Sequence, residues 1–169
     1  MSALVRPARP ADFPAIGRLT VAAYRADGQL NAAADFYADR LADVVTRADQ
    51  AELLVAVDPG TGDVLGAVAF CMAGSAYAEL ATDGEAEFRM LAVDPAAQGR
   101  GVGEALAMAC LTRADEAGCS AVVICVRDFA MAAQRLYARL GFQRAPDLDW
   151  MPGPGIQLLG LRRALPLTS

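Results

Sequence analysis

The spacing of apolar residues predicts strands and helices that alternate along the 169-residue chain. Short apolar runs predict strands, and apolar residues that recur every three or four positions predict helices. The predicted strands cover residues 3–7, 51–57, 64–72, 88–93, 121–126 and 156–161. The predicted helices cover about residues 13–23, 32–47, 102–117 and 129–140. The passages 74–83 and 145–155 show neither pattern, so they are predicted as loops.

Two connections predict how neighbouring strands pair. The turn-rich segment 58–63 joins two apolar runs, which is typical of an antiparallel hairpin. The helix at 102–117 joins strands 88–93 and 121–126, so these strands are expected to be parallel in a βαβ unit. The sequence therefore predicts one α/β (α+β) domain over residues 1–169, with a mixed, mostly antiparallel sheet of six or seven strands and about four helices.

A glycine-rich turn stands between strand 88–93 and the next helix. Asp94-Pro95 ends the strand because proline cannot donate to a sheet ladder. Three glycines then alternate before the helix begins: Gly99, Gly101 and Gly103. Glycines let a ligand approach the backbone, and the first N–H groups of a helix favour negative charge. The turn either binds a phosphate group, with Arg100 adding a positive charge, or is a connector that binds nothing.

Two common phosphate-binding loops do not fit this turn. The chain has no Gly-Lys-Ser/Thr, so a nucleoside-triphosphate loop is excluded. A dinucleotide fingerprint needs a small residue where this chain has Leu106 or Glu104, depending on which glycine begins the motif. A Rossmann site is therefore not expected.

Charge narrows the classes of partner. The chain has 15 Lys and Arg against 20 Asp and Glu, a net charge of −5, whereas nucleic acids and anionic membranes bind basic surfaces. The longest nearly apolar run, 64–78, is shorter than the roughly 20 residues that span a bilayer, and no signal-peptide pattern is visible. We expect no nucleic-acid partner, no membrane partner and a cytoplasmic location.

The reactive side chains exclude several mechanisms. The chain has no histidine, so Ser-His-Asp and Cys-His catalysis and the usual zinc sites are not expected, and we predict no metal site. Its cysteines lie in apolar surroundings and form no Cys-x-x-Cys pair: Cys71, Cys110, Cys119 and Cys125. They are predicted to be buried free thiols.

Two segments resemble motifs of the GNAT acyltransferase superfamily. The family's acetyl-coenzyme A signature is Gln/Arg-x-x-Gly-x-Gly/Ala, and this chain has Gln98-Gly99-Arg100-Gly101-Val102-Gly103 after Leu91-Ala92-Val93-Asp94-Pro95. Residues 133–142 resemble the family's Ala-x-x-x-Tyr-x-x-x-Gly-Phe. The family commonly has Asn three residues before that alanine, where this chain has Ala130. The resemblance implies a GNAT-like sheet with a central splay and acetyl-CoA as cosubstrate.

The resemblance also implies roles for individual residues. The turn at Gln98, Gly99, Arg100, Gly101, Val102 and Gly103 would hold the diphosphate of the cofactor. The backbone of Leu91, Ala92 and Val93 would bind the pantetheine amides. Tyr137 would give a proton to the leaving thiolate, although its position in the apolar helix pattern also fits a core tyrosine.

Glu87 is the candidate general base. It shares strand parity with Leu91 and Val93, so its carboxylate is expected on their face of the sheet. A solvated carboxylate at the strand end is the alternative interpretation. The nearby acidic residues steer a cationic amine or form a solvated loop: Glu79, Asp83, Glu85 and Glu87.

The predicted function is acetyl-CoA-dependent N-acetylation of a primary amine, carried by a small molecule or a peptide, by direct attack. A non-catalytic acyl-CoA sensor and a transferase for another acyl group are the alternatives. The identity of the acceptor and the oligomeric state, including a homodimer, stay open.

Overall fold

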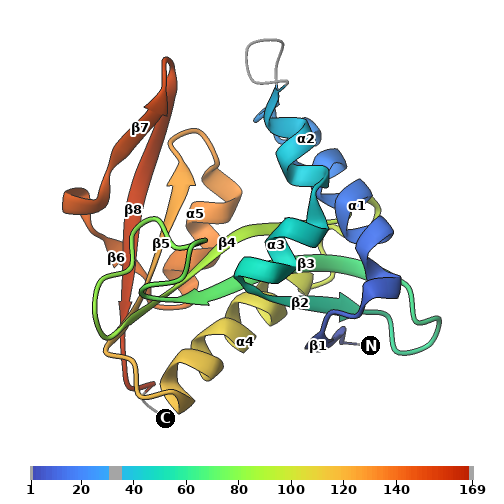
Figure 1. The fold of residues 1–169 in the computed structure, drawn as a ribbon, viewed down its shortest axis with the longest axis horizontal. Helices are drawn as coiled ribbons and strands as arrows, with labels where there is room; N and C mark the ends of the chain where they lie inside the picture. Colours follow the sequence, from blue (N-terminus) through green and yellow to red (C-terminus); the bar gives the residue numbers. More distant parts are fainter. Residues whose placement is uncertain (1, 31–35, 168–169) are drawn as a thin grey trace. The chain divides into compact units, whose positions relative to one another are not determined.

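The computed structural model describes residues 2–30 and 36–167 (Figure 1). The helices are α1 Phe13–Ala26, α2 Phe36–Ala42, α3 Val44–Gln50, α4 Val102–Glu116 and α5 Met131–Arg139, with short 3-10 helices η1 Pro10–Asp12, η3 Pro95–Ala97 and η4 Pro146–Leu148. The strands are β1 Leu4–Pro7, β2 Glu52–Val57, β3 Val64–Met72, β4 Glu85–Val93, β5 Ala121–Arg127, β6 Gln143–Arg144, β7 Trp150–Gly153 and β8 Ile156–Ala164. These strands belong to an eight-stranded sheet that is mostly antiparallel, which confirms the predicted fold class, although the predicted number of six or seven strands is too low.

The chain divides into two compact units. The first comprises Met1–Phe70 and Met90–Ala109, and the second comprises Cys71–Arg89 and Cys110–Ser169. The backbone passes between them within β3, β4 and α4. The single-domain boundary 1–169 stays a prediction.

The first unit holds the start of α4 against β3. Strands β1, β2 and β3 pair in sequence order, each antiparallel to the next, so the predicted hairpin is confirmed. A Cβ added at Gly66 on β3 would lie 2.9 Å from Cγ1 of Val102 and 2.8 Å from the carbonyl oxygen of Ala92. The missing side chain therefore lets the first turn of α4 pack on β3, with Val102 and Leu106 buried.

The second unit is built around β5. Its residues pair with β8 from Ala121 to Arg127, antiparallel, along the length of the strand. They pair with β4 in parallel only from Ala121 to Val123, opposite Glu85 to Glu87. The parallel pairing expected of the βαβ unit is confirmed, and its ladder ends after Glu87. Strands β6 and β7 pair with β8 (Figure 1).

Two predicted segments differ from the structure. Residues 32–35 of the predicted helix 32–47 lie outside the described residues, and the rest is interrupted at Asp43. The Asp43 carboxylate accepts the N–H of Thr46 at 3.2 Å, which is an N-cap that starts α3 as a separate helix. The segment 145–155 is not a plain loop, because it contains η4 and β7, which extends as an arm beside β8 (Figure 1).

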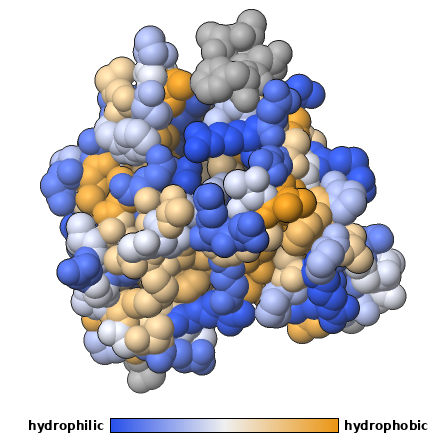
Figure 2. Space-filling view, viewed as in Figure 1, coloured by the Kyte–Doolittle hydropathy of each residue, from blue (hydrophilic) through white to orange (hydrophobic). Residues whose placement is uncertain are grey.

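The surface carries isolated apolar side chains among polar ones. On the face shown in Figure 2, hydrophilic and hydrophobic residues are interspersed. Large apolar residues that are exposed include Val45 and Met151. None of the helices in residues 2–30 and 36–167 has the length and apolar character that crossing a bilayer requires.

Candidate active site

The glycine turn of the first unit is open. It follows η3, where the Asp94 carboxylate accepts the N–H of Ala96 at 2.9 Å, and residues 98–101 are exposed. Gly99 has φ +82 and Gly101 has φ +76, both in the left-handed region that L side chains rarely adopt. A Cβ at either position would meet no atom within 4 Å. The turn therefore leaves space for a group that approaches the backbone.

Helix α4 begins directly after this turn. The first intrahelical hydrogen bond to the turn runs from the N–H of Ala105 to the carbonyl oxygen of Gly101, at 3.1 Å. Val102 and Leu106 are buried and fix the helix axis, while Gly103 is partly exposed. The N–H groups of the first turn carry the positive end of the helix dipole, so the turn and the helix start suit a phosphate group.

Arg100 does not stand alone in this turn. Its guanidinium lies 3.0 Å from the Asp58 carboxylate on the β2–β3 connection, and this ion pair lowers the pKa of Asp58. The same carboxylate accepts the N–H of Gly60 at 2.8 Å. Part of the positive charge expected from Arg100 is therefore already balanced. Gln98 donates from Nε2 to the carbonyl oxygen of Val93 at 3.4 Å, which ties the turn to the end of β4.

Met90 interrupts the regular geometry of β4. Its φ is +55, a left-handed value that is uncommon for a residue other than glycine. Beyond it, Leu91 and Val93 are partly exposed and Ala92 is buried with Leu19 and Ala23. The sequence argument that Glu87 shares a face with Leu91 and Val93 assumed strict two-residue alternation. That argument does not hold across Met90.

Glu87 is the most buried acidic residue of the second unit. Glu87 is only 1% exposed, so the alternative interpretation, a solvated carboxylate at the strand end, is wrong. Oε1 accepts the backbone N–H groups of Glu79 at 3.0 Å, Leu80 at 2.8 Å and Ala81 at 3.0 Å. Burial raises the pKa of Glu87, and the three N–H donors oppose this effect. The role of Glu87 as a base stays a prediction.

Tyr137 is enclosed by two other aromatic rings. Its ring centroid lies 5.9 Å from that of Phe88 and 5.7 Å from that of Phe142, within the range of favourable aromatic pairs. Burial raises the pKa of Tyr137, so the phenol stays protonated at neutral pH. Gly141 has φ +88 and follows the end of α5, close to the predicted end of this helix at residue 140. Ala130 is the N-cap residue of α5 and makes no side-chain capping bond.

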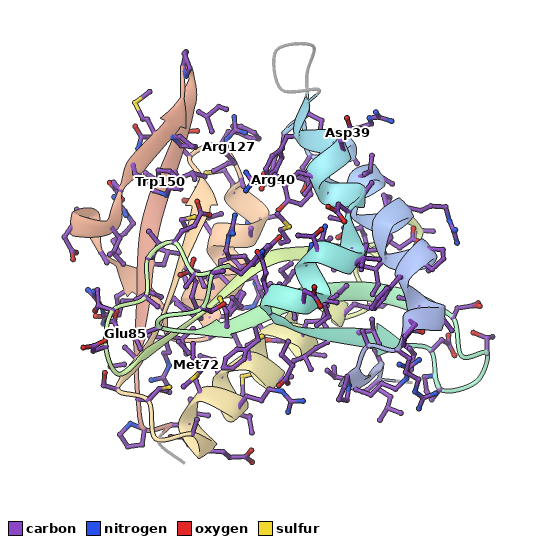
Figure 3. All side chains as sticks on the ribbon, viewed as in Figure 1. Asp39, Arg40, Met72, Glu85, Arg127 and Trp150 are labelled. Carbon is purple, nitrogen blue, oxygen red and sulfur yellow. The ribbon has the colours of Figure 1, made fainter. Side chains whose placement is uncertain are left out.

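Two acidic residues near Glu87, Glu79 and Glu85, are paired with neighbouring groups. Glu79 forms an ion pair with Arg89 at 2.5 Å. Glu85 accepts the N–H and the hydroxyl of Thr82 through Oε1 and lies 3.5 Å from Arg162 through Oε2 (Glu85 is labelled in Figure 3). These contacts hold Glu79 and Glu85 to their own unit, while Asp83 is exposed. A role of the cluster in steering an amine stays a prediction.

The cysteines are free thiols, as the sequence predicted, but the predicted burial is wrong for Cys125. Cys71, Cys110 and Cys119 are buried, and Cys125 is partly exposed. Burial raises the pKa of Cys125 to about 11, against a smaller opposite effect of Trp150. A thiol with that pKa is a poor nucleophile at neutral pH, because only the thiolate reacts. Within the described residues, no three His, Cys, Asp or Glu side chains group as metal ligands would.

The predicted site residues fall into two groups. The predicted cofactor-binding residues, Leu91 to Val93 and Gln98 to Gly103, all belong to the first unit. Glu87 and Tyr137 belong to the second. Sequence reasoning missed the turn at 79–81 as the partner of Glu87. No local signal could have found it, because the contact joins residues six to eight positions apart through an irregular loop.

Comparisons with known proteins show which family the chain resembles. A model described as "Acetyltransferase (GNAT) family" matches residues 14–142. No curated protein matches the chain. A GCN5-related N-acetyltransferase from Kribbella flavida is 26% identical with a TM-score of 0.69, and the match covers 97% of this chain and 98% of that one.

Two other solved structures share the fold. A protein from Corynebacterium glutamicum, described as histone acetyltransferase HPA2 and related acetyltransferase, is 24% identical with a TM-score of 0.74 over 100% of this chain and 99% of that one. The putative acetyltransferase yncA from Salmonella typhimurium, solved with acetyl-CoA, is 23% identical with a TM-score of 0.67 over 100% of this chain and 97% of that one.

Proposed function

Because the chain belongs to the acetyltransferase (GNAT) family, we propose that it transfers the acetyl group of acetyl-CoA to a primary amine on a small molecule or peptide. The observation that carries this proposal is the open turn at Gly99 and Gly101, where the backbone is bare and the start of α4 favours an anion. The Salmonella typhimurium structure with acetyl-CoA supports this choice of donor. The free cysteines fit a reducing compartment, so the proposed location is the cytoplasm.

The proposal gives the cofactor two backbone contacts in the first unit. The N–H groups from Gln98 to Gly103 hold the diphosphate, with Arg100 sharing its charge between the diphosphate and Asp58. The backbone of Leu91 to Val93, where β4 has no ladder with β5, binds the amides of the pantetheine arm. Both contacts use main-chain groups, so an acidic chain of net charge −5 needs no basic patch to bind an anionic cofactor.

The chemistry is a direct attack. The neutral amine nitrogen bonds to the thioester carbonyl carbon, the carbon–sulfur bond breaks, and the proton that the amine loses ends on the thiol of CoA. Tyr137 serves as hydrogen-bond donor to the departing thiolate. Since its pKa is raised above the ordinary value, the phenol holds its proton and stabilises the sulfur mainly through that hydrogen bond. A covalent intermediate on Cys125 is not part of the proposal, because that thiol has a pKa of about 11.

The test is thiol release from acetyl-CoA by the purified full chain with a panel of amines. We expect CoA-SH to form in step with an acetylated amine identified by mass spectrometry. Calorimetry with CoA should show saturable binding to one site. A chain that neither binds CoA nor releases thiol with any amine would refute the proposal.

A non-catalytic acyl-CoA sensor is the second candidate, and Ala130 is the observation that favours it. At this position the family commonly has Asn, and the alanine provides no polar contact for the pantetheine arm. Binding of CoA without turnover on any amine would support the sensor. Comparing acetyl-, propionyl- and succinyl-CoA as donors decides between acetyl transfer and transfer of another acyl group.

A further inference from the structure

Three consecutive backbone N–H groups in the second unit point at one carboxylate oxygen. Oε1 of Glu87 lies 3.0, 2.8 and 3.0 Å from the nitrogens of Glu79, Leu80 and Ala81. The charge on the carboxylate strengthens such bonds. A proton taken up by Glu87 during the reaction would weaken all three at once. The geometry therefore suits an anchor for residues 79–81 better than a group that takes up and releases a proton in each turnover.

The anchored residues form part of a cavity wall. Glu79 and Leu80 line a cavity of about 470 Å³ whose other lining residues come from η4 and β7: Asp147, Leu148, Asp149 and Trp150. This volume lies in the range of small-molecule sites. All of these residues belong to the second unit.

The wall formed by η4 and β7 is fixed by strand β8. A Cβ added at Gly160 would lie 2.3 Å from Cβ of Leu148, so the absent side chain gives η4 its place. The Asp149 carboxylate accepts the N–H of Gly160 at 2.7 Å. Trp150 lies opposite Leu158, which in turn lies opposite Arg127 on β5 (Trp150 and Arg127 are labelled in Figure 3). The wall formed by Glu79 and Leu80 belongs to no strand, and their hydrogen bonds to Glu87 fix it instead.

The cavity offers apolar surface rather than net charge. Glu79 is paired with Arg89 at 2.5 Å, and Asp149 is paired with Arg144 at 2.9 Å. Asp147 lies 3.7 Å from Arg162 and is largely exposed. The lining residues that carry no charge are Leu80, Leu148 and Trp150. Such a lining recognises a hydrocarbon or aromatic group.

We propose that Glu87 is a positioning residue that fixes residues 79–81 as one wall of this cavity, and that the cavity holds the apolar part of the amine acceptor. The proposal rests on the acetyltransferase function proposed above. It assigns Glu87 no proton transfer.

Two variants of Glu87 distinguish a role as an anchor from a role as a general base. Glu87→Gln keeps an oxygen that accepts N–H groups, so we expect turnover within about fivefold of wild type and an unchanged acid limb in the pH profile of kcat/KM. Glu87→Ala removes the acceptor. With phenethylamine as the acceptor, we expect this variant to raise the Michaelis constant about tenfold, with a smaller change in kcat and an unchanged Kd for CoA. Glu116→Ala, an exposed glutamate at the end of α4, is the matched control.

Amide hydrogen exchange in the full chain tests whether Glu87 anchors residues 79–81, and this test does not depend on enzymatic activity. Losing hydrogen bonds to a charged group should speed exchange at residues 79–81 by about 10- to 100-fold in Glu87→Ala, and much less in Glu87→Gln. If Glu87→Ala does not fold, Leu80→Ala keeps the anchor and removes one wall. Leu80→Ala should raise the Michaelis constant for phenethylamine and leave the Michaelis constant for putrescine nearly unchanged.

Three results would overturn the proposal. A loss of about 10²- to 10⁴-fold in turnover for Glu87→Gln, with loss of the acid limb, would make Glu87 the base. An unchanged rate of amide exchange at residues 79–81 in Glu87→Ala would show that Glu87 does not anchor them. A wild-type preference for putrescine over phenethylamine would remove the apolar cavity as the acceptor site. A wild type inactive on every amine would instead refute the proposed function, and the exchange data would still report on the anchor.

Discussion

Two irregular turns of this chain present consecutive backbone N–H groups, and they differ in what those groups meet. At residues 79–81 the donors are occupied by the buried carboxylate of Glu87. At residues 98–101 the turn is exposed and the space in front of its glycines is empty within 4 Å. The first turn is stabilised by an anion that the chain supplies, whereas we propose that the second receives one from outside. Backbone donors thus serve structure or binding, depending on whether an acidic side chain of the chain reaches them.

The largest expected effect comes from blocking the open turn. Gly101→Val places a branched side chain at φ +76 and into the approach path, so we expect CoA binding to be lost in calorimetry. Left-handed strain costs about 1–2 kcal/mol, which the fold should tolerate. Gly118→Val is the control, because it has φ +78 and the same empty surroundings at the other end of α4. Equal losses of CoA affinity in both variants would contradict a binding role for the turn.

The next effect separates chemistry from binding. Tyr137→Phe keeps the ring between Phe88 and Phe142, so its stability and its Kd for CoA should stay close to wild type. Losing the phenol hydroxyl should lower kcat about 10- to 100-fold, the size expected for loss of a hydrogen bond to a charged group such as the departing thiolate. Steady-state kinetics with calorimetry measures both. An unchanged rate would take Tyr137 out of the mechanism.

A smaller effect tests another anion that the chain supplies to itself. The Asp12 carboxylate is buried, accepts the N–H of Arg9 at 2.8 Å and pairs with Arg6 at 2.8 Å. We expect Asp12→Asn to lower the free energy of unfolding by about 1–3 kcal/mol at neutral pH, from urea denaturation.

The pH dependence of that loss has a definite sign. The Arg6 guanidinium lowers the pKa of Asp12 below its unfolded value, so the native state binds fewer protons than the unfolded state in that range. The stabilisation is therefore present above about pH 4 and disappears as the pH falls through the native pKa. The curves of wild type and Asp12→Asn should converge in acid. A difference that persists at the lowest pH where both fold would contradict this account.

The smallest expected effect concerns Arg100. Since Asp58 already balances part of its charge, Arg100→Ala should weaken CoA binding by only about two- to fivefold, and less at high salt. Titrations at two ionic strengths measure this. A loss of 100-fold would show that the side chain, rather than the backbone of the turn, dominates the anion site.

The sequence predicted those parts of the molecule that local chemistry determines. The α4 helix and its glycine turn follow from spacing and from residues with distinctive backbone preferences. Strand β7 was missed because Pro152 and Gly153 are turn residues, and only its pairing with β8 makes it a strand. The left-handed Met90 was missed because methionine gives no signal for that conformation. The contacts of Glu87 were missed because a strand glutamate usually faces water, and its loop partners are set by tertiary packing.

The shielding of the sulfur atoms has a practical consequence for enzymology. Burial raises the pKa of Cys71 to about 12 and that of Cys125 to about 11, so these side chains react slowly with disulfide and maleimide dyes. In a turnover assay with such a dye, Cys71 and Cys125 therefore add little colour to that of the released coenzyme.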